Sequence, residues 1–386
     1  MKRSLHLALA LAGLVLPAEA VPQAAIPTPP ADVANIPVYL AVDLSSGQVL
    51  AGRDADRPFL PASVTKVMTA WVAFQLIAAG KLRPEQTLTV RPETWRAWSA
   101  QGTGMQLKSG ELVSVDALLH GITTVSANNA SVVLAEGALG SIAAWTAMMN
   151  DEARKLGMTQ SHFATPNGWP DGGATHVSAA DLVRLGQALI ERHPDLYERY
   201  FGQKTFTWNG VTGQNHDPML GVVPGADGIK TGHTNESGYS FLGTAQRDGR
   251  RIMIVIGGAP SGDQRAAGAR ALVEWGFSSW QSRPLFRKAE LVGEALVQSG
   301  DTREVGLLAG QNVSVTVPHG AQTQPTLRIR YRGPLVAPFE KGAELAELEV
   351  AVPGQPVARL PLVAARAVGA AGPLDRLLNG LAGLWR

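Results

Sequence analysis

Alternating hydrophobic and polar positions predict a β-hairpin at each end of the first 280 residues. Residues 38–43 and 48–52 flank Ser45-Ser46-Gly47, and residues 239–247 and 251–256 are joined by Asp248-Gly249. Both turns are rich in residues that favour chain reversal, and Asp-Gly suits a tight hairpin because both residues tolerate positive φ.

Between these hairpins, apolar residues recur at helical spacing. The predicted helices cover residues 61–79, 125–139, 142–156 and 178–191, and a closing helix covers 263–280. Strands at both ends with helices between them predict an α+β fold, in which the terminal strands pair into one antiparallel sheet with helices on its faces. We expect this first domain to span residues 36–283.

From Pro284 onward the pattern changes to short β-prone runs separated by Gly and Pro, such as 313–317, 327–331 and 345–350. These runs predict a small β-rich domain over residues 284–366. It holds no cluster of His, Ser or carboxylates typical of catalysis, so we interpret it as a spacer or docking module.

The two ends of the chain have their own patterns. Residues 1–20 have a cationic start at Lys2 and Arg3, an apolar stretch, and the small-x-small site Ala18-Glu19-Ala20. This is typical of a secretory signal peptide, since the apolar run is shorter than a spanning helix needs. Residues 21–35, rich in proline, are predicted to be an extended linker.

The last segment, residues 367–386, is predicted to be a linker followed by an amphipathic helix. Between 373 and 386, leucines and a tryptophan recur at helical spacing and share one face. Fourteen residues are too few to cross a bilayer, so we expect this helix to lie on a membrane surface, or alternatively to dock on the protein itself.

Charge and composition exclude several classes of protein. Loss of residues 1–20 with the signal peptide removes Lys2, Arg3 and Glu19, which leaves 32 basic and 31 acidic residues. A nearly neutral chain argues against nucleic acid as a partner. The absence of cysteine excludes disulfides, thiolate nucleophiles and Cys-based metal sites.

The helix predicted from Pro61 is apolar almost all round, yet it contains Lys66. A buried ammonium is costly, and burial beside another cation lowers the pKa of a lysine toward the range of a general base. Ser63 precedes Lys66 by three residues and shares its helical face. The pair therefore has the features of a serine nucleophile with its proton acceptor.

Two further motifs accompany Ser63-Val64-Thr65-Lys66. Ser126-Ala127-Asn128 precedes an apolar run, where Ser and Asn are also common as helix caps. Lys230-Thr231-Gly232 fits a strand ending at a glycine, with Lys230 as the cation that binds a substrate carboxylate and lowers the pKa of Lys66. We expect Gly232 to let a ligand backbone approach closely. The three motifs together are typical of penicillin-binding proteins and serine β-lactamases.

The chain resembles the low-molecular-mass penicillin-binding proteins of the D-alanyl-D-alanine carboxypeptidase type, peptidase family S11. The resemblance extends from about Ile36 to the C-terminus. Besides the three motifs, it rests on Pro61-Ala62, Val67-Met68-Thr69, Trp208-Asn209-Gly210, Asp227-Gly228-Ile229, His233-Thr234 and Trp275-Gly276-Phe277. It implies a β-lactamase/transpeptidase-like catalytic domain, a β-rich second domain and an amphipathic C-terminal helix.

The resemblance also implies roles for individual residues. Ser63 is the acylated nucleophile, Lys66 the general base, and Ser126 and Asn128 the second catalytic element, while Lys230, Thr231 and Gly232 bind substrate. His233 follows as in the family and is either a residue that shapes deacylation or an ordinary loop histidine. Arg265 is either a contact for the substrate carboxylate or a surface arginine.

The sequence departs from the family at two places. His216 stands where an arginine is frequent, which leaves the stem-peptide preference open, and Ala127 replaces a frequent glycine. The implied activity is that of a serine D-Ala-D-Ala carboxypeptidase that trims peptidoglycan stem peptides and binds β-lactam antibiotics, exported and associated with the inner-membrane surface. Neither a metal nor a cofactor is expected.

Four alternative functions fit the sequence less well. A Ser-His-Asp hydrolase lacks its G-x-S-x-G elbow, since Gly238-Tyr239-Ser240-Phe241 is followed by Leu242. A zinc peptidase lacks an HExxH pair. A serine β-lactamase shares the three motifs but not the other matching stretches or the second domain. A peptidoglycan-binding scaffold without activity is disfavoured because the three motifs are complete.

Overall fold

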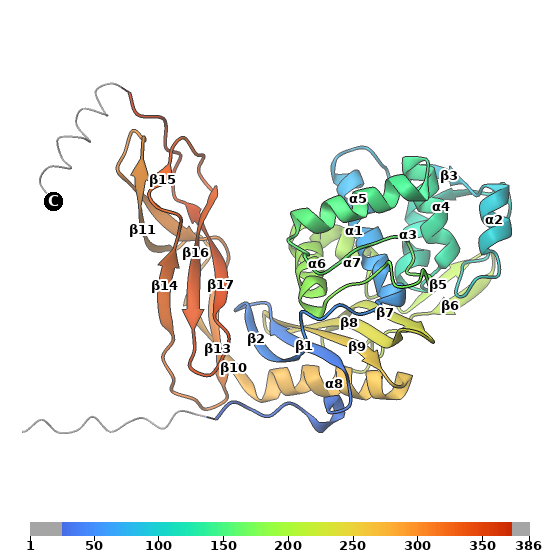
Figure 1. Ribbon diagram of the computed structural model, residues 1–386, viewed down its shortest axis with the longest axis horizontal. Helices are drawn as coiled ribbons and strands as arrows, with labels where there is room; N and C mark the ends of the chain where they lie inside the picture. The colour runs from blue at the N-terminus through green and yellow to red at the C-terminus, as the bar shows by residue number, and fades with distance from the viewer. Residues whose placement is uncertain (1–24, 373–386) are drawn as a thin grey trace, which may run out of the picture.

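The computed structural model describes residues 25–372. The predicted signal peptide and the predicted amphipathic helix lie outside the described residues. The chain forms an elongated molecule with a larger α+β body and a smaller β-rich body beside it (Figure 1). This arrangement agrees with the predicted fold class.

The larger body is built on a five-stranded antiparallel sheet of order β2-β1-β9-β8-β7. Its strands are β1 (Val38–Asp43), β2 (Gln48–Arg53), β7 (Ala226–Thr234), β8 (Gly238–Arg247) and β9 (Arg250–Ala259). Both predicted hairpins are present, and β1 pairs with β9, which joins the two ends of this domain as expected.

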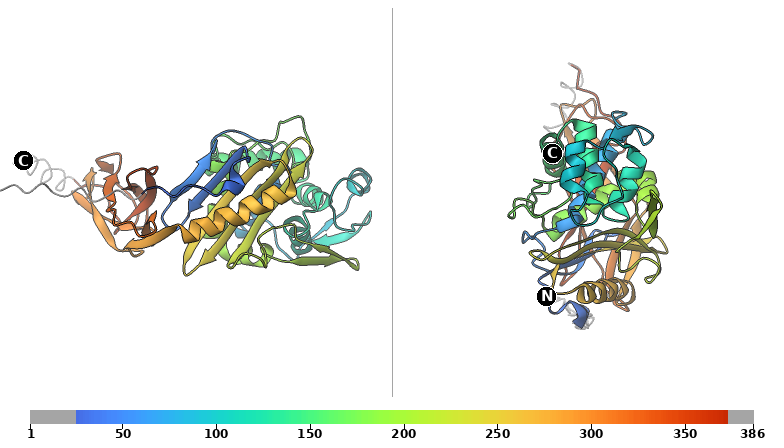
Figure 2. Two further views of the ribbon diagram at one scale, coloured as in Figure 1. Left: turned by 90° about the horizontal axis from the view of Figure 1, so that it is seen from below. Right: turned by 90° about the vertical axis from the view of Figure 1, so that its right-hand side faces the viewer.

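Helices cover both faces of this sheet because its strands are apolar on both sides. In β9, Met253 and Val255 belong to the core under the main helical layer, whereas Ile252, Ile254 and Ile256 face the other way. This alternation is the period of two of a β-strand. The second face is covered by α8 (Gly262–Ser278), which lies across the strands (Figure 2).

The main helical layer contains the predicted helices, with small shifts at their ends, and three helices over residues 92–98, 115–123 and 194–200 that were not predicted. It contains α1 (Lys66–Ala78), α2 (Pro92–Trp98), α3 (Val115–Thr123), α4 (Asn128–Leu139), α5 (Ile142–Lys155), α6 (Ala179–Arg192) and α7 (Pro194–Tyr200). A 3-10 turn, η2 (Ala62–Thr65), leads directly into α1. Two short antiparallel strand pairs complete the layer: β3 (Thr87–Thr89) with β4 (Leu112–Ser114), and β5 (Thr205–Trp208) with β6 (Val211–Gln214).

The segment predicted as an extended linker ends in a 3-10 turn, η1 (Ala31–Val33). Val33 is 1% exposed and belongs to the core formed with α8. A Cβ on Gly268 of α8 would lie 3.4 Å from a Val33 methyl group and 2.7 Å from Ile36, so the helix packs closely on this turn. Residues 31–36 are therefore part of the packed body.

The smaller body has its own hydrophobic core. It consists of β10 (Trp280–Phe286), β11 (Leu291–Gln298), β12 (Glu304–Ala309), β13 (Val313–Pro318), β14 (Thr326–Arg330), β15 (Leu335–Val336), β16 (Glu344–Ala351) and β17 (Ala358–Ala364). β10 pairs with β13, and the other six strands form one sheet. The β-rich character predicted from the sequence is confirmed.

The two bodies are joined by a buried polar network. Asp43 and Thr316 are fully buried, and Thr316 Oγ1 donates to Asp43 Oδ2 at 2.7 Å. Asp43 also accepts from Arg250 Nε at 2.6 Å, and Ser46 Oγ lies 2.8 Å from Thr316 Oγ1. The Arg250 guanidinium pairs with the Asp43 carboxylate through Nε, although its Nη2 has no partner, so the network joins the β1–β2 hairpin to β13 without leaving a buried charge unpaired.

Among the described residues, no single helix has both the length and the hydropathy to cross a bilayer. Only α4 and α5 taken together, bent by 90° at their junction, would meet those two criteria.

Candidate active site

Ser63 and Lys66 lie at the junction of η2 and α1. Lys66 is the first residue of α1, and its Nζ is 2.6 Å from Ser63 Oγ. In a 3-10 turn, side chains three residues apart eclipse one another, which is why this spacing brings the hydroxyl and the amine together. Ala62, just before the serine, has a positive φ of 46°, a strained conformation that proteins retain mainly at functional sites.

The Lys66 side chain is almost completely buried, with 1% exposure. Its Nζ donates to Asn128 Oδ1 at 2.7 Å and to the backbone oxygen of Asn167 at 2.9 Å. Burial, and then the charge of Lys230, lower the pKa of Lys66 well below its usual value. Both causes lower the pKa of Lys66, and neither comes from a carboxylate, whose negative charge would raise this pKa.

The second motif lies immediately before α4. Ser126 has a positive φ of 63°, and Asn128 is the first helical residue. The capping interpretation is wrong, because Ala127 occupies the N-cap position and no side chain caps this helix. Asn128 instead bonds to Lys66 through its oxygen, while its Nδ2 donates to the backbone oxygen of Gln101 at 3.0 Å.

The third motif lies on β7, the edge strand next to the nucleophile. The strand does not end at Gly232 as predicted but continues to Thr234. A Cβ on Gly232 would lie 2.2 Å from the oxygen of Pro61 and 3.2 Å from the nitrogen of Ser63. The expected reason for this glycine, approach of a ligand, is therefore incomplete: it also allows β7 to pack directly against the turn that holds the nucleophile.

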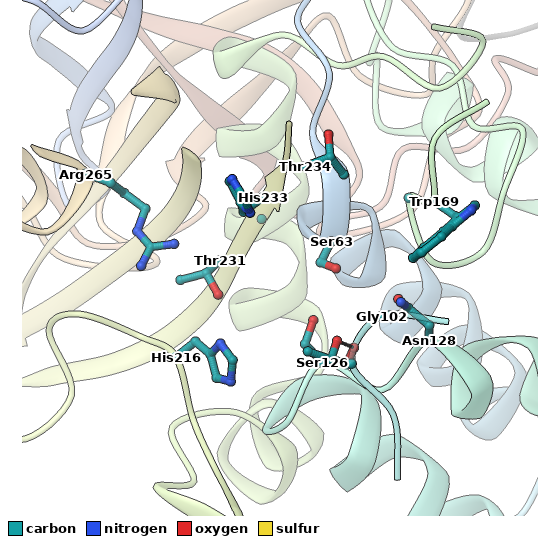
Figure 3. A pocket seen from close by; sticks show the side chains of 13 residues that line it. Ser63, Gly102, Ser126, Asn128, Trp169, His216, Thr231, His233, Thr234 and Arg265 are labelled. Carbon is teal, nitrogen blue, oxygen red and sulfur yellow. Dashed lines mark hydrogen bonds between the residues drawn. The ribbon is translucent and has the colours of Figure 1, made fainter. Parts of the chain in front are cut away.

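These elements surround a cavity of about 300 Å³ (Figure 3). Arg265, His216 and Thr231 lie on one side of Ser63, and Trp169 lies on the other. The lining residues are Ser63, Gly102, Thr103, Ser126, Asn128, Gly168, Trp169, His216, Thr231, Gly232, His233, Thr234 and Arg265.

One end of the cavity is cationic. Burial and then the charge of Arg265 lower the pKa of Lys230 to about 7. Burial, followed by Lys230 and Arg265, also lowers the pKa of His216. Burial raises the pKa of the neighbouring Asp217 to about 6, even though Met219 N and Leu220 N donate to its carboxylate. Of these groups, Arg265 and His216 line the cavity, while Lys230 is 4% exposed and is not among the lining residues. The Arg265 guanidinium therefore supplies the positive charge that suits an anionic ligand at this end.

His233 and Arg265 are held by one aromatic ring. The imidazole of His233 stacks on Tyr239 with 3.9 Å between ring centres, and the Arg265 guanidinium lies 5.7 Å from the same ring. Both side chains line the cavity, so the structure places them with the predicted site residues.

Sequence reasoning missed the segment 165–170. It supplies the Asn167 carbonyl to Lys66 and the Trp169 side chain to the cavity wall. Residues 102 and 103, which precede the second motif by more than twenty positions, were also missed. Glycine, proline and asparagine in Thr165-Pro166-Asn167-Gly168 indicate a loop. Nothing in their order indicates which distant element the loop touches.

A serine hydroxyl beside a desolvated lysine, with a cationic end for an anionic ligand, is the arrangement typical of a serine acyl-transfer enzyme. Comparisons with known proteins narrow this class. Residues 25–261 match the family model of D-alanyl-D-alanine carboxypeptidase, peptidase S11, and residues 280–370 match that of the penicillin-binding protein 5 C-terminal domain.

Similar proteins include the D-alanyl-D-alanine carboxypeptidases DacD of Salmonella typhimurium and DacA of Escherichia coli. DacD is 32% identical over 98% of this chain and 97% of its own length. DacA is 33% identical over 84% and 81%, respectively. Penicillin-binding protein 5 of Haemophilus influenzae has a similar structure, with a TM-score of 0.75 and 29% identity over 89% of this chain and 99% of that one. The chain belongs to the peptidase S11 family of D-alanyl-D-alanine carboxypeptidases.

Proposed function

We propose that this protein removes the terminal D-alanine from peptidoglycan stem pentapeptides through an acyl-Ser63 intermediate, and that β-lactams acylate the same serine. The observation that carries the proposal is the contact of Ser63 Oγ with the buried Lys66 amine, 2.6 Å away, in a chain of this family. The sequence similarity extends through both bodies of its relatives.

The surroundings of Lys66 explain how a lysine acts as a base. A neutral amine has two hydrogens and one lone pair. Asn128 Oδ1 and the Asn167 oxygen accept the two hydrogens, so the lone pair is directed at the Ser63 hydroxyl. Lys66 thereby takes the hydroxyl proton as Ser63 attacks the penultimate D-alanine carbonyl.

The cationic end of the cavity orients the substrate. The free carboxylate of the terminal D-alanine binds there, near Lys230, Thr231 and Arg265. His233, which stacks on Tyr239, forms part of the cavity wall near this end. The oxygen that becomes negative at the attacked carbonyl faces backbone N–H groups, one of them from Ser63 and the other from edge strand β7 near Gly232.

Proton transfers through Lys66 complete the cycle. Ser126, which lines the cavity beside Asn128, passes the proton from Lys66 to the departing amine, and D-alanine leaves. Water then attacks the acyl-Ser63 ester while Lys66 accepts one of its protons, and Lys66 returns that proton to Ser63 Oγ as the ester bond breaks, which regenerates the free serine and the neutral amine. No metal or redox cofactor takes part in these steps.

Two substitutions test this proposal. Ser63→Ala is expected to abolish both D-alanine release from a D-Ala-D-Ala pentapeptide and covalent labelling by fluorescent penicillin. Lys66→Ala is expected to lower the acylation rate by roughly 10²–10⁴-fold, the usual contribution of a general base. Ser314→Ala and Lys288→Ala, in the β-rich body, are the matched controls. Penicillin labelling of Ser63→Ala would refute the nucleophile, and normal acylation of Lys66→Ala would refute the base.

The lifetime of the penicilloyl enzyme distinguishes a carboxypeptidase from a β-lactamase. A long-lived acyl-Ser63 is expected, whereas rapid release of hydrolysed penicillin would indicate a lactamase. Analysis of products for dimeric peptides shows whether water is the only acceptor.

Export and attachment to the outer face of the cytoplasmic membrane form part of the proposal. The signal-like residues 1–20 and the leucine-rich stripe of residues 373–386 support it. Deletion of residues 373–386 is expected to move the protein from the membrane fraction to the aqueous fraction. Unchanged fractionation would contradict the anchor.

A further inference from the structure

A shallow notch continues the active-site cavity on the side away from the cationic end. It shares Gly168, Trp169 and Thr234 with the main cavity, and Leu60, Pro170 and Glu236 also line it. Its volume is about 20 Å³, so a side chain lies along it rather than inside it.

The direction of the substrate follows from the two ends of the site and rests on the proposed function. Arg265 and Trp169 lie on opposite sides of Ser63 (Figure 3). If the terminal carboxylate binds near Arg265 and the next carbonyl meets Ser63, the rest of the stem peptide leaves toward Trp169. One residue advances an extended chain by roughly 3.5 Å, so the third stem residue lies at the notch.

The Trp169 indole is held in place before any substrate binds. It meets the Trp98 ring edge to face, with 5.8 Å between centres and 84° between planes. A Cβ on Gly102 would lie 2.8 Å from its Cζ3, so the backbone there packs directly on the ring. Its backbone nitrogen donates to Asn167 Oδ1 at 3.0 Å. A fixed aromatic face binds an extended methylene chain with little loss of entropy and also attracts a cation.

Two carboxylates line the notch, those of Asp171 and Glu236, and they differ in how free they are to bind a ligand. The backbone nitrogen and the hydroxyl of Thr175 both donate hydrogen bonds to the Asp171 carboxylate, so this carboxylate is already engaged within the protein. Glu236 is exposed, and within residues 25–372 it forms no ion pair. It therefore offers a carboxylate to a ligand that passes over Trp169.

We infer that Trp169 and Glu236 form a subsite for the third residue of the stem peptide, specific for a straight-chain diamino acid. The methylene chain lies on the Trp169 indole and along Pro170, and the ω-ammonium group meets the Glu236 carboxylate. These two residues determine specificity and take no part in proton transfer.

The test compares two peptides that differ only in the ω-amine. They are Nα-acetyl-L-Lys-D-Ala-D-Ala, with a free ε-ammonium, and its Nε-acetylated form, and kcat/KM is measured from D-alanine release. An exposed ion pair contributes up to about 1 kcal/mol, so the free amine is expected to be preferred by about three- to five-fold. The preference is expected to disappear in high salt, because an exposed pair is screened.

Variants then assign the preference to residues. Glu236→Gln is expected to equalise the two peptides while leaving acylation by benzylpenicillin unchanged, and Glu340→Gln, an exposed glutamate of the β-rich body, is the matched control. Trp169→Leu is expected to raise KM for both peptides. Equal kcat/KM for the two peptides in the unaltered enzyme, or a preference that persists in Glu236→Gln, overturns the inference. Absence of D-alanine release from both peptides overturns the proposed function instead.

Discussion

Replacement of Gly232 by alanine tests how strongly the reactivity of Ser63 depends on the packing of β7 against η2, the turn that contains this serine. The added Cβ would lie 2.2 Å from the Pro61 oxygen, whereas such contacts require at least 3.0 Å. The strand and the turn must therefore separate by about 0.8 Å. Both partners are backbone, so no flexible side chain can yield. Misplacement of reacting groups by 1 Å costs about 10²-fold in rate, which sets the expected loss for Gly232→Ala.

The rate to measure is the second-order rate constant for acylation by fluorescent penicillin, together with kcat/KM for D-alanine release. Both are expected to fall by about 10²-fold. Gly262→Ala is the matched control, since its Cβ would lie 3.4 Å from the Tyr239 ring, an ordinary contact. It is expected to react at the unaltered rate. Full acylation activity in Gly232→Ala, with an unchanged melting temperature, would show that the turn does not position Ser63 as argued.

Three further predictions concern charge. Lys230→Met should flatten the rise in stability between about pH 7 and pH 10, measured as urea midpoints. In that window the unfolded lysine binds a proton that the folded one, with a pKa of about 7, does not, so stability rises with pH by at most ~1.4 kcal/mol per unit. Asn128→Asp places a carboxylate near the Lys66 amine, which raises the amine pKa by about 1–3 units and should move the acidic limb of the acylation pH profile upward. Asp43→Ala leaves Arg250 unpaired and should lower the free energy of unfolding by about 3–5 kcal/mol in chemical denaturation.

The sheet and its helices could be predicted because buried apolar residues recur along the sequence with the period of a strand or a helix. The strand expected at 251–256 is the centre of β9, where alternate isoleucines face α8. The apolar sequence around Lys66 predicted that the lysine is buried, and the structure gives it 1% exposure. Local pattern and global fold agree at these positions, as is typical of natural sequences.

The rest could not be predicted because it depends on contacts between distant backbone segments. Asn167 contacts Lys66 through its carbonyl oxygen, a group that every residue has, so its identity carries no signal. The antiparallel pair of β3 with β4 has three residues on each strand, too few to show a period of two. The sequence predicted that a ligand approaches Gly232 closely, whereas only the folded chain shows that the Pro61 oxygen lies next to this glycine.

The loop at 165–170 connects the base of the reaction to the subsite inferred for the third stem residue. Lys66 and Thr69, one turn apart on α1, donate to the successive carbonyl oxygens of Asn167 and Pro166. The side chain of Asn167 in turn accepts from the nitrogen of Trp169. Because one helix face holds the whole loop, the indole has a fixed position relative to the amine. If the inferred subsite binds the third residue, the binding energy gained there is expected to position the penultimate carbonyl over Ser63 and so to raise kcat as well as affinity.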